Sequence, residues 1–268
     1  MTDKAVVTRR LVEMTSLQFA QAVKACDTLI LPLASVEQGG GHCPLGTDLL
    51  TAEAVALLIA CKADALVAPS IPYGDALELE GKPGTVSVDS RVFETYVAAV
   101  AESFLRQGFR TIVFLCCHSL DLRAVDGLCR RLRVQGCCVG AVDWWKAVGA
   151  AAKGKTGSRE PFGHCGEVIT SAMLALAPGL VDLENAQEEA SLPGLAFAGH
   201  HAPGSPFVAY GTFSDYCQSG AWGDVKDYAT AAKGRAWVDE AVEDSARFIR
   251  ELRETLPASP AQTTHSLP

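Results

Sequence analysis

Residues 35–48, SVEQGGGHCPLGTD, place Glu37, His42 and Asp48 within twelve positions around three consecutive glycines. Carboxylates and imidazoles with open geometry are ligands that suit Zn, Mn or Fe. Such an ion lowers the pKa of a bound water to about 7 and polarises a carbonyl, which is what a hydrolase requires. The same loop could also be a flexible turn that carries polar residues, and residue types alone leave both interpretations open.

Each polar residue along the chain also has a purely structural interpretation. Asp48 precedes a predicted helix and could only cap it, and Glu37 could be a solvated loop residue. His118 follows a very apolar run, where a single histidine is more often hydrogen-bonded within the fold than bound to a ligand. Glu167 follows His164 at the start of another predicted helix, where a carboxylate could simply interact with the helix dipole.

The elements that must position these residues alternate between strand and helix. Four short runs are almost continuously apolar, as buried parallel strands are, and the segments between them repeat apolar residues at helical spacing. The predicted strands cover 28–34, 65–71, 111–117 and 137–143, and the predicted helices 49–62, 90–107 and 121–134. This order predicts an α/β fold with a mostly parallel sheet that helices cover on both faces.

The second half of the chain is less regular. Residues 149–163 are rich in Gly and Lys without a period and predict a mobile loop, and residues 199–224 are weakly strand-like. Helices are predicted over 165–176 and 227–254. Because no domain boundary or internal repeat is visible, residues 1–254 are predicted to form a single domain, and residues 255–268 a disordered tail.

Polar groups follow three of the predicted strands directly. Glu37 lies three residues beyond the first strand, the sequence IPYGD follows the second, and His118 follows the third. Because the carboxyl ends of parallel strands meet at one edge of a sheet, these segments should converge although they lie far apart in the chain. This convergence favours a ligand site more strongly than any one of the residues does.

The composition excludes several kinds of partner. The net charge is −8, and basic residues form no cluster beyond short pairs such as Arg130 and Arg131, so nucleic acid is not an expected partner. The first ten residues lack the apolar core of a secretory signal, and no uninterrupted apolar run is long enough to span a membrane. We therefore expect a cytoplasmic protein that has no membrane partner. The ten cysteines are interpreted as free, mostly buried thiols.

Five motifs, in order, resemble the creatininase (creatinine amidohydrolase) family. LPLASVEQGGGHCPLGTD is similar to the family pattern LPxGSxEQHGPHLPLxTD, and PSIPYGDALELEGKPGTVSV to PxxxYGxSxxHxxFPGTxSL. QGFRTIVFLCCHSLD is similar to GFRxIxxxNGHGGN, GHCGEVITSAMLALAPGLVD to HAGExETSxMLxLxPxLVD, and GAWGDVKDYATAAKG to GVxGDPxxATxEKG. The resemblance covers nearly the whole chain except its ends.

The resemblance implies a three-layer α/β/α sandwich, a homo-oligomer and a metal centre, commonly binuclear, that hydrolyses cyclic or linear amides. The implied metal ligands are Glu37, Asp48 and His118, with Asp48 at the position of the carboxylate that bridges two ions. The implied catalytic residues are His164, at the position of the acid/base histidine, and Glu167. His42 also matches a motif position, as a ligand or as a residue behind the ligands.

The departures from the family pattern concern the second ion. Gly39 stands where the family has an imidazole, Leu120 where creatininases have a further carboxylate, and Ile169 where the family has Glu. Glycine, leucine and isoleucine offer no side-chain ligand. One divalent transition metal ion (Zn, Mn or Fe) per site is therefore expected rather than two.

Cysteines and aromatic residues in or near the same motifs could complete the site. A thiolate could replace a missing ligand, or the thiols could simply fill space beside the site. The candidates, besides His42, are Cys43, Cys116 and Cys117, and Cys165 also lies within one of the motifs. Aromatic side chains could line a pocket for a flat ring or could be plain packing. The candidates for that pocket are Trp144, Trp145 and Tyr73.

Three functions are compatible with these residues. The leading hypothesis is a metal-dependent hydrolase that cleaves the C–N bond of a small, cyclic amide through a metal-activated water, with His164 as proton donor. The first alternative uses the same ion as a Lewis acid for a non-amide ring opening, C–C cleavage or isomerisation in a biosynthetic or catabolic pathway. The second is a non-catalytic, divergent family member.

Overall fold

The computed structural model describes residues 8–187, 189, 212–215 and 217–259. Its strands are β1 (Thr28–Leu33), β2 (Leu66–Val67), β3 (Thr111–Cys116) and β4 (Cys138–Asp143). They form one parallel sheet in the order β2-β1-β3-β4. The helices are α1 (Ser16–Ala25), α2 (Thr47–Ala63), α3 (Ser90–Arg106), α4 (Ser119–Val134), α5 (Trp144–Ala152), α6 (Glu167–Leu176), α7 (Val225–Tyr228) and α8 (Ala231–Thr255).

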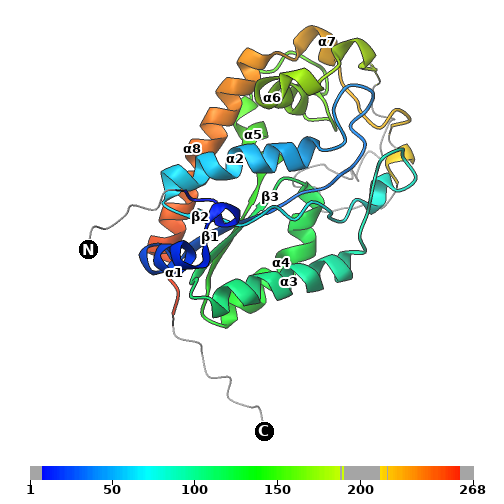
Figure 1. The fold of residues 1–268 in the computed structure, drawn as a ribbon. Coiled ribbons are helices and arrows are strands. Elements are labelled where there is room, and N and C mark those ends of the chain that lie inside the picture. The colour runs from blue at the N-terminus through cyan, green and yellow to red at the C-terminus, as the bar shows by residue number, and fades with distance from the viewer. Residues whose placement is uncertain (1–7, 188, 190–211, 216, 260–268) are drawn as a thin grey trace.

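Two hydrophobic cores cover the two faces of the sheet, because successive side chains of a strand point to opposite faces. In β1, Leu29, Leu31 and Leu33 pack on the face covered by α1, α3 and α4, whereas Ile30 packs on the face covered by α2, α5, α6 and α8. Both sets of helices are visible on either side of the strands in Figure 1. The predicted α/β/α sandwich is thereby confirmed.

The predicted strand 65–71 is much shorter in the structure. Only Leu66 and Val67 pair with β1, because Pro69 has no N–H to donate to the ladder. Ile71 then returns to the sheet as an isolated parallel bridge to Leu33. The chain that follows, which includes Gly74, is thus held beside the carboxyl end of β1.

Helix α1 was not among the predicted elements. Its start is a capping box, in which the Gln18 N–H donates to Thr15 Oγ1 at 3.3 Å and the Thr15 N–H donates to Gln18 Oε1 at 2.8 Å. The helix has a short apolar face, of which only Ala22 and Val23 are buried. This weak pattern accounts for its absence from the prediction.

The predicted mobile loop 149–163 is mostly fastened to the body of the protein. Its first residues complete helix α5, which ends at Ala152. Beyond that helix, Lys155 pairs with Glu240 at 2.8 Å and Arg159 with Asp224 at 3.0 Å. The loop therefore has fixed partners on α8 and just before α7.

Two other predictions lie partly outside the described residues. Residues 199–211 of the weakly strand-like segment and residues 260–268 of the predicted tail are not described. Within the described part of the chain, no helix combines the length and the apolar character needed to cross a membrane.

Candidate metal centre

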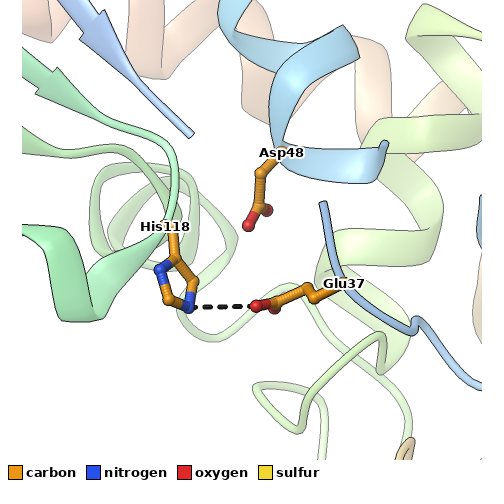
Figure 2. A group of neighbouring side chains, drawn as sticks. All are labelled: Glu37, Asp48 and His118. Atoms are coloured by element: carbon orange, nitrogen blue, oxygen red, sulfur yellow. Dashed lines mark ion pairs between the residues drawn. The ribbon is translucent and has the colours of Figure 1, made fainter. Parts of the chain in front are cut away.

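Glu37, Asp48 and His118 lie together at the carboxyl edge of the sheet. Glu37 follows β1, His118 follows β3 and precedes α4, and Asp48 lies in the first turn of α2. One ligand atom from each lies within 4.8 Å of the other two. Figure 2 shows the three side chains pointing toward one region. Because β1 and β3 are neighbours in the sheet, the predicted convergence of their loops is what places Glu37 beside His118.

All three side chains are buried. The exposed fractions are 7% for Glu37, 5% for Asp48 and 7% for His118, so Glu37 is not a solvated loop residue. Its Oε2 atom lies 3.2 Å from His118 Nε2, the ion pair drawn in Figure 2. Carboxylates buried at such short range need a compensating positive charge, which a protonated imidazole or a bound cation would supply.

A divalent ion fits this donor set. Apart from its ion pair with His118, the buried Glu37 Oε2 atom has no hydrogen-bond partner among the described residues. Burial, followed by repulsion from Glu37, raises the pKa of Asp48 to about 7. Two carboxylates and one imidazole are side chains that commonly bind a divalent ion such as zinc, so these three residues would hold such an ion.

Asp48 does not cap its helix, which settles one of the alternatives left open by its position. The N-cap residue of α2 is Gly46, and no side-chain cap is formed. Instead, Ser35 Oγ donates to Asp48 Oδ2 at 3.0 Å and Trp145 Nε1 donates to Asp48 Oδ1 at 2.9 Å. These two donors fix the carboxylate and leave it lone pairs for a metal ion.

His118 is oriented by Asp121, a residue that the sequence reasoning missed. His118 Nδ1 lies 3.3 Å from Asp121 Oδ1, which also accepts the Asp75 N–H at 3.1 Å. Asp121 is fully buried against Gly74, where an added Cβ would come within 2.2 Å of Asp121 Oδ1. A metal-binding histidine commonly donates its other N–H to such a carboxylate. The three-residue spacing from His118 was the available signal.

We expect Asp121→Asn to weaken metal binding by about 10- to 100-fold, because an amide supports the imidazole less well than a carboxylate does. Asparagine is also the residue of the family pattern at this position, and it has the size of Asp121, so the fold should be kept. Competition with a chromophoric chelator would measure the zinc dissociation constants of both proteins. Equal constants would show that Asp121 has no such role.

The protonation states of the metal-free site predict a pH-dependent affinity. Burial lowers the pKa of His118, but the charge of Glu37 and the hydrogen bond to Asp121 outweigh burial and raise this pKa well above 6.5. His118 is then protonated at pH 7 in the metal-free protein, and an ion must displace that proton.

Zinc affinity should therefore rise about tenfold per pH unit above pH 7, up to the raised pKa of His118, and more steeply below pH 7. The steeper part arises because Asp48, with a pKa of about 7, must then also lose a proton. Calorimetric titrations in buffers of different ionisation enthalpy would count the released protons. An affinity that does not change with pH would contradict the assigned ligands.

His164 lies beside the same carboxylate. Its Nδ1 donates to the Gly220 carbonyl at 2.7 Å, and its Nε2 lies 3.1 Å from Glu37 Oε1. Burial lowers the pKa of His164, but the hydrogen bond and the charge of Glu37 outweigh burial and raise it. The His164 side chain is 18% exposed, which is more than any of the three ligands. An imidazole beside the ligands whose raised pKa favours the protonated form is suited to proton donation.

Two aromatic rings that the sequence reasoning did not select surround His164. The ring of Phe213 lies edge-on to the imidazole with centroids 4.7 Å apart, and that of Trp222 lies 6.4 Å away. Trp222 belongs to the motif GAWGD, but nothing in that motif marks an aromatic residue as part of a site. Of the residues predicted to form a pocket, none has a described ring contact with His164.

The predicted pocket residues separate into three environments. Trp144 is fully buried and packs in the core with α2 and α8, which agrees with the plain packing that was its alternative. Trp145 holds Asp48, as described above. Tyr73 is 47% exposed beside Gly74, and its role as a pocket residue stays a prediction.

Glu167 is not brought to the ligand group. Its fully buried carboxylate accepts the N–H groups of Gly157 and Ser158, at 2.9 and 2.8 Å, and pairs with Lys233 Nζ at 2.9 Å. These contacts fasten the loop after α5 to the start of α6. The catalytic role predicted for Glu167 has no support in this geometry.

The candidate cysteine ligands and His42 also lie outside the group of three. Cys116 and Cys117 are completely buried, and burial raises the pKa of both thiols well above the ordinary value. His42 Nε2 is 3.0 Å from both the Cys165 carbonyl and Thr170 Oγ1. In the described part of the chain, no cysteine joins Glu37, Asp48 and His118.

Gly39 has no room for the missing imidazole. A Cβ added there would lie 2.9 Å from Cys43 Cβ and 3.0 Å from Cys165 Sγ. Ile169 likewise packs against an apolar cluster that contains these two cysteines. Side chains of other residues therefore occupy the direction in which a ligand at position 39 would extend.

The fold agrees with comparisons to known proteins. The chain is 28% identical over 270 residues to 3-dehydro-scyllo-inosose hydrolase of Thermotoga maritima, covering 91% of this chain and 84% of that protein. It is 28% identical over 260 residues to creatinine amidohydrolase of Pseudomonas putida, covering 89% and 95%. A solved mutant creatininase described as the Zn–Zn type has a TM-score of 0.75 at 25% identity, covering 93% of this chain and 99% of the other.

A family model covers most of the chain as well. The model described as Creatininase: Creatinine amidohydrolase matches residues 12–249, which include every residue of the candidate centre. The relatives named above are hydrolases by their names, and the parallel sheet with helices on both faces agrees with the creatininase structure. The chain therefore belongs to the creatininase family.

Proposed function

We propose that the protein is a metal-dependent amidohydrolase that cleaves a C–N bond of a small, cyclic substrate. One observation carries the proposal: Glu37, Asp48 and His118 present ligand atoms within 4.8 Å of one another, with His164 bonded to the same Glu37 at 3.1 Å. The Glu37 carboxylate thus contacts both the ligand His118 and the proton donor His164. The hydrolase names of the relatives support the reaction class.

Glu37, Asp48 and His118 would hold the ion, which when bound would activate water and polarise the carbonyl of the substrate. His164 would supply the proton that the leaving nitrogen needs when the C–N bond breaks. His164 Nδ1 donates a hydrogen bond to the Gly220 carbonyl. This bond orients the ring so that Nε2 faces Glu37. Trp145 and Ser35 would keep Asp48 in its binding orientation.

A single ion per site is part of the proposal. The contacts of Gly39 with Cys43 and Cys165, and the apolar Leu120 at the other ligand position, support it. Solved relatives are titled with zinc or with manganese, so both ions stay candidates, and zinc is the ion used in the tests below. A small-molecule substrate and a homo-oligomer, as implied by the family resemblance, remain predictions, as does a cytoplasmic location.

A second candidate reaction uses the same ion as a Lewis acid for a non-amide ring opening, C–C cleavage or isomerisation. The observation that favours it is the similarity to a hydrolase named for an inosose, which is a cyclic polyol ketone without an amide. The loss of the imidazole at Gly39 further distinguishes this chain from the family pattern. Both reactions need the same three ligands but differ in what leaves the substrate.

Metal analysis and product mass together test the proposal. Purified protein reconstituted with zinc should contain about one ion per chain and should turn over cyclic amides with gain of one water and a free amine at the opened bond. Turnover of a cyclic ketone without amine would favour the second reaction. Absence of any bound metal would overturn both and leave a non-catalytic member as the remaining interpretation.

A further inference from the structure

Three departures from the family pattern meet at one place in the structure. Gly39 replaces His, Cys43 replaces Leu, and Cys165 replaces Ala. The first two lie in the loop that carries the ligands, and Cys165 follows His164 more than a hundred residues later. Cys43 and Cys165 pack in the same buried cluster, with exposed fractions of 8% and 2%.

The two thiols are close neighbours. The Cβ position at Gly39 lies 2.9 Å from Cys43 Cβ and 3.0 Å from Cys165 Sγ, so these two atoms are less than about 6 Å apart and the two side chains are neighbours, as a disulfide requires. The two side chains also interact with each other, since each shifts the pKa of the other. An imidazole at position 39 would clash with this pair, whereas glycine leaves room for it.

The surroundings hold Cys165 in an unusual backbone conformation. Its φ angle is +49°, a left-handed value that residues other than glycine seldom adopt. The Cys165 carbonyl accepts a hydrogen bond from Thr170 Oγ1 at 2.7 Å and lies 3.0 Å from His42 Nε2. These contacts account for the positions of His42 and Thr170, which the proposed reaction does not use.

The same contacts prepare one of the two thiols for oxidation. The hydrogen bond from Cys165 lowers the pKa of Cys43 well below its ordinary value although burial opposes this, and His42 and Thr170 contribute in the same direction. The pKa of Cys165 is raised by its hydrogen bond to Cys43 and by burial. An attacking thiolate and a neighbouring protonated thiol form the usual arrangement of a redox-active pair.

We propose that Cys43 and Cys165 form a reversible intramolecular disulfide, so that this pair is a redox modification site beside the metal centre. With a peroxide as oxidant, the Cys43 thiolate is oxidised to a sulfenic acid, and the peroxide is reduced to hydroxide. The Cys165 sulfur then attacks the Cys43 sulfur and the sulfenic oxygen leaves as water, so that two thiols and one peroxide give one disulfide and two waters.

The disulfide joins two segments that both serve the candidate centre. Cys43 lies between Glu37 and Asp48, and Cys165 is the residue after His164. A covalent bond between them would restrict opening of the ligand loop, and loss of a bound ion to a chelator should therefore be slower. This kinetic consequence rests on the proposed metal function, whereas formation of the disulfide does not.

Peptide mapping after oxidation tests the proposal directly. Folded protein treated with hydrogen peroxide should lose two of its ten thiols and should yield a Cys43–Cys165 linked peptide that a dithiol reductant removes. In Cys165→Ala, which restores the family residue, no linked peptide should form, and dimedone should trap the sulfenic acid on Cys43. Cys61→Ser removes an exposed thiol and should leave the linked peptide unchanged.

The chelator experiment provides a second readout in the same samples. Zinc release should slow several-fold on oxidation in the wild type and in Cys61→Ser, but not in Cys165→Ala. If the linked peptide forms and zinc does not bind, the metal proposal fails and the redox site stands. If Cys43 and Cys165 stay reduced while other cysteines oxidise, in protein whose circular dichroism is native, the redox proposal is overturned.

Discussion

Replacement of Asp48 by alanine should remove the bound metal and lower kcat/KM by at least about 10³-fold, or about 4 kcal/mol of transition-state stabilisation. Asp48 is the central carboxylate of the predicted ligand set and is held by donors from Ser35 and Trp145. Without it, Glu37 and His118 offer only two ligands. Metal content after dialysis and steady-state kinetics would measure both losses.

A thermal-shift comparison separates loss of the ion from loss of the fold. Zinc should raise the melting temperature of the wild type, because it binds only the native state, and should not change that of Asp48→Ala. Asp89→Ala is a suitable control, since Asp89 caps α3 with an exposed carboxylate far along the chain from the ligands. This control should lose some stability, because it removes a helix cap, but should keep its metal. Full zinc binding by Asp48→Ala would contradict the ligand assignment.

Replacement of His164 by glutamine should leave metal binding intact and lower kcat by about 10²- to 10⁴-fold. Glutamine can still donate to Gly220 or Glu37, but it cannot transfer a proton to the leaving nitrogen. The penalty should shrink for substrates whose leaving group is less basic, because these need no proton. A change confined to KM would place His164 in substrate binding instead.

The pH dependence of the same variant gives a separate test. Burial lowers the pKa of His164, but its hydrogen bond to Glu37 and the charge of Glu37 raise it overall, which favours the protonated form that a proton donor needs. This form is lost as the pH rises through the pKa of His164, so wild-type kcat should fall on the alkaline side. The variant should lack this fall. An identical alkaline limb in both proteins would assign it to another group.

Sequence and structure give different information about position 39, where the family pattern has a histidine ligand for a second ion. Gly39 was visible in the sequence as a missing ligand, but only the structure shows that Cys43 and Cys165 fill the space. Replacement of Gly39 by histidine alone would therefore produce a clash with Cys43 and Cys165. The residues at positions 39, 43 and 165 differ from the family pattern together because these residues pack against one another.

Local patterns in the sequence determined the sheet and the approximate site. The apolar runs that became β1 and β3 need no distant partner to be recognised, because two buried faces require continuous apolar character. Their order in a parallel sheet then placed Glu37 and His118 at one edge, as the structure shows. Strand ends and topology alone predicted that Glu37 and His118 converge, whereas the ligand set that includes Asp48 came from the family resemblance.

The tertiary structure decided which polar contacts each residue makes. Trp145 reaches Asp48 from almost a hundred residues away, and Asp121 reaches both His118 and the segment at Gly74. Glu167 matched a family motif, yet its carboxylate is used by Gly157, Ser158 and Lys233. Hydrogen bonds between distant segments depend on side-chain packing in three dimensions, and neither residue spacing nor local propensity encodes them.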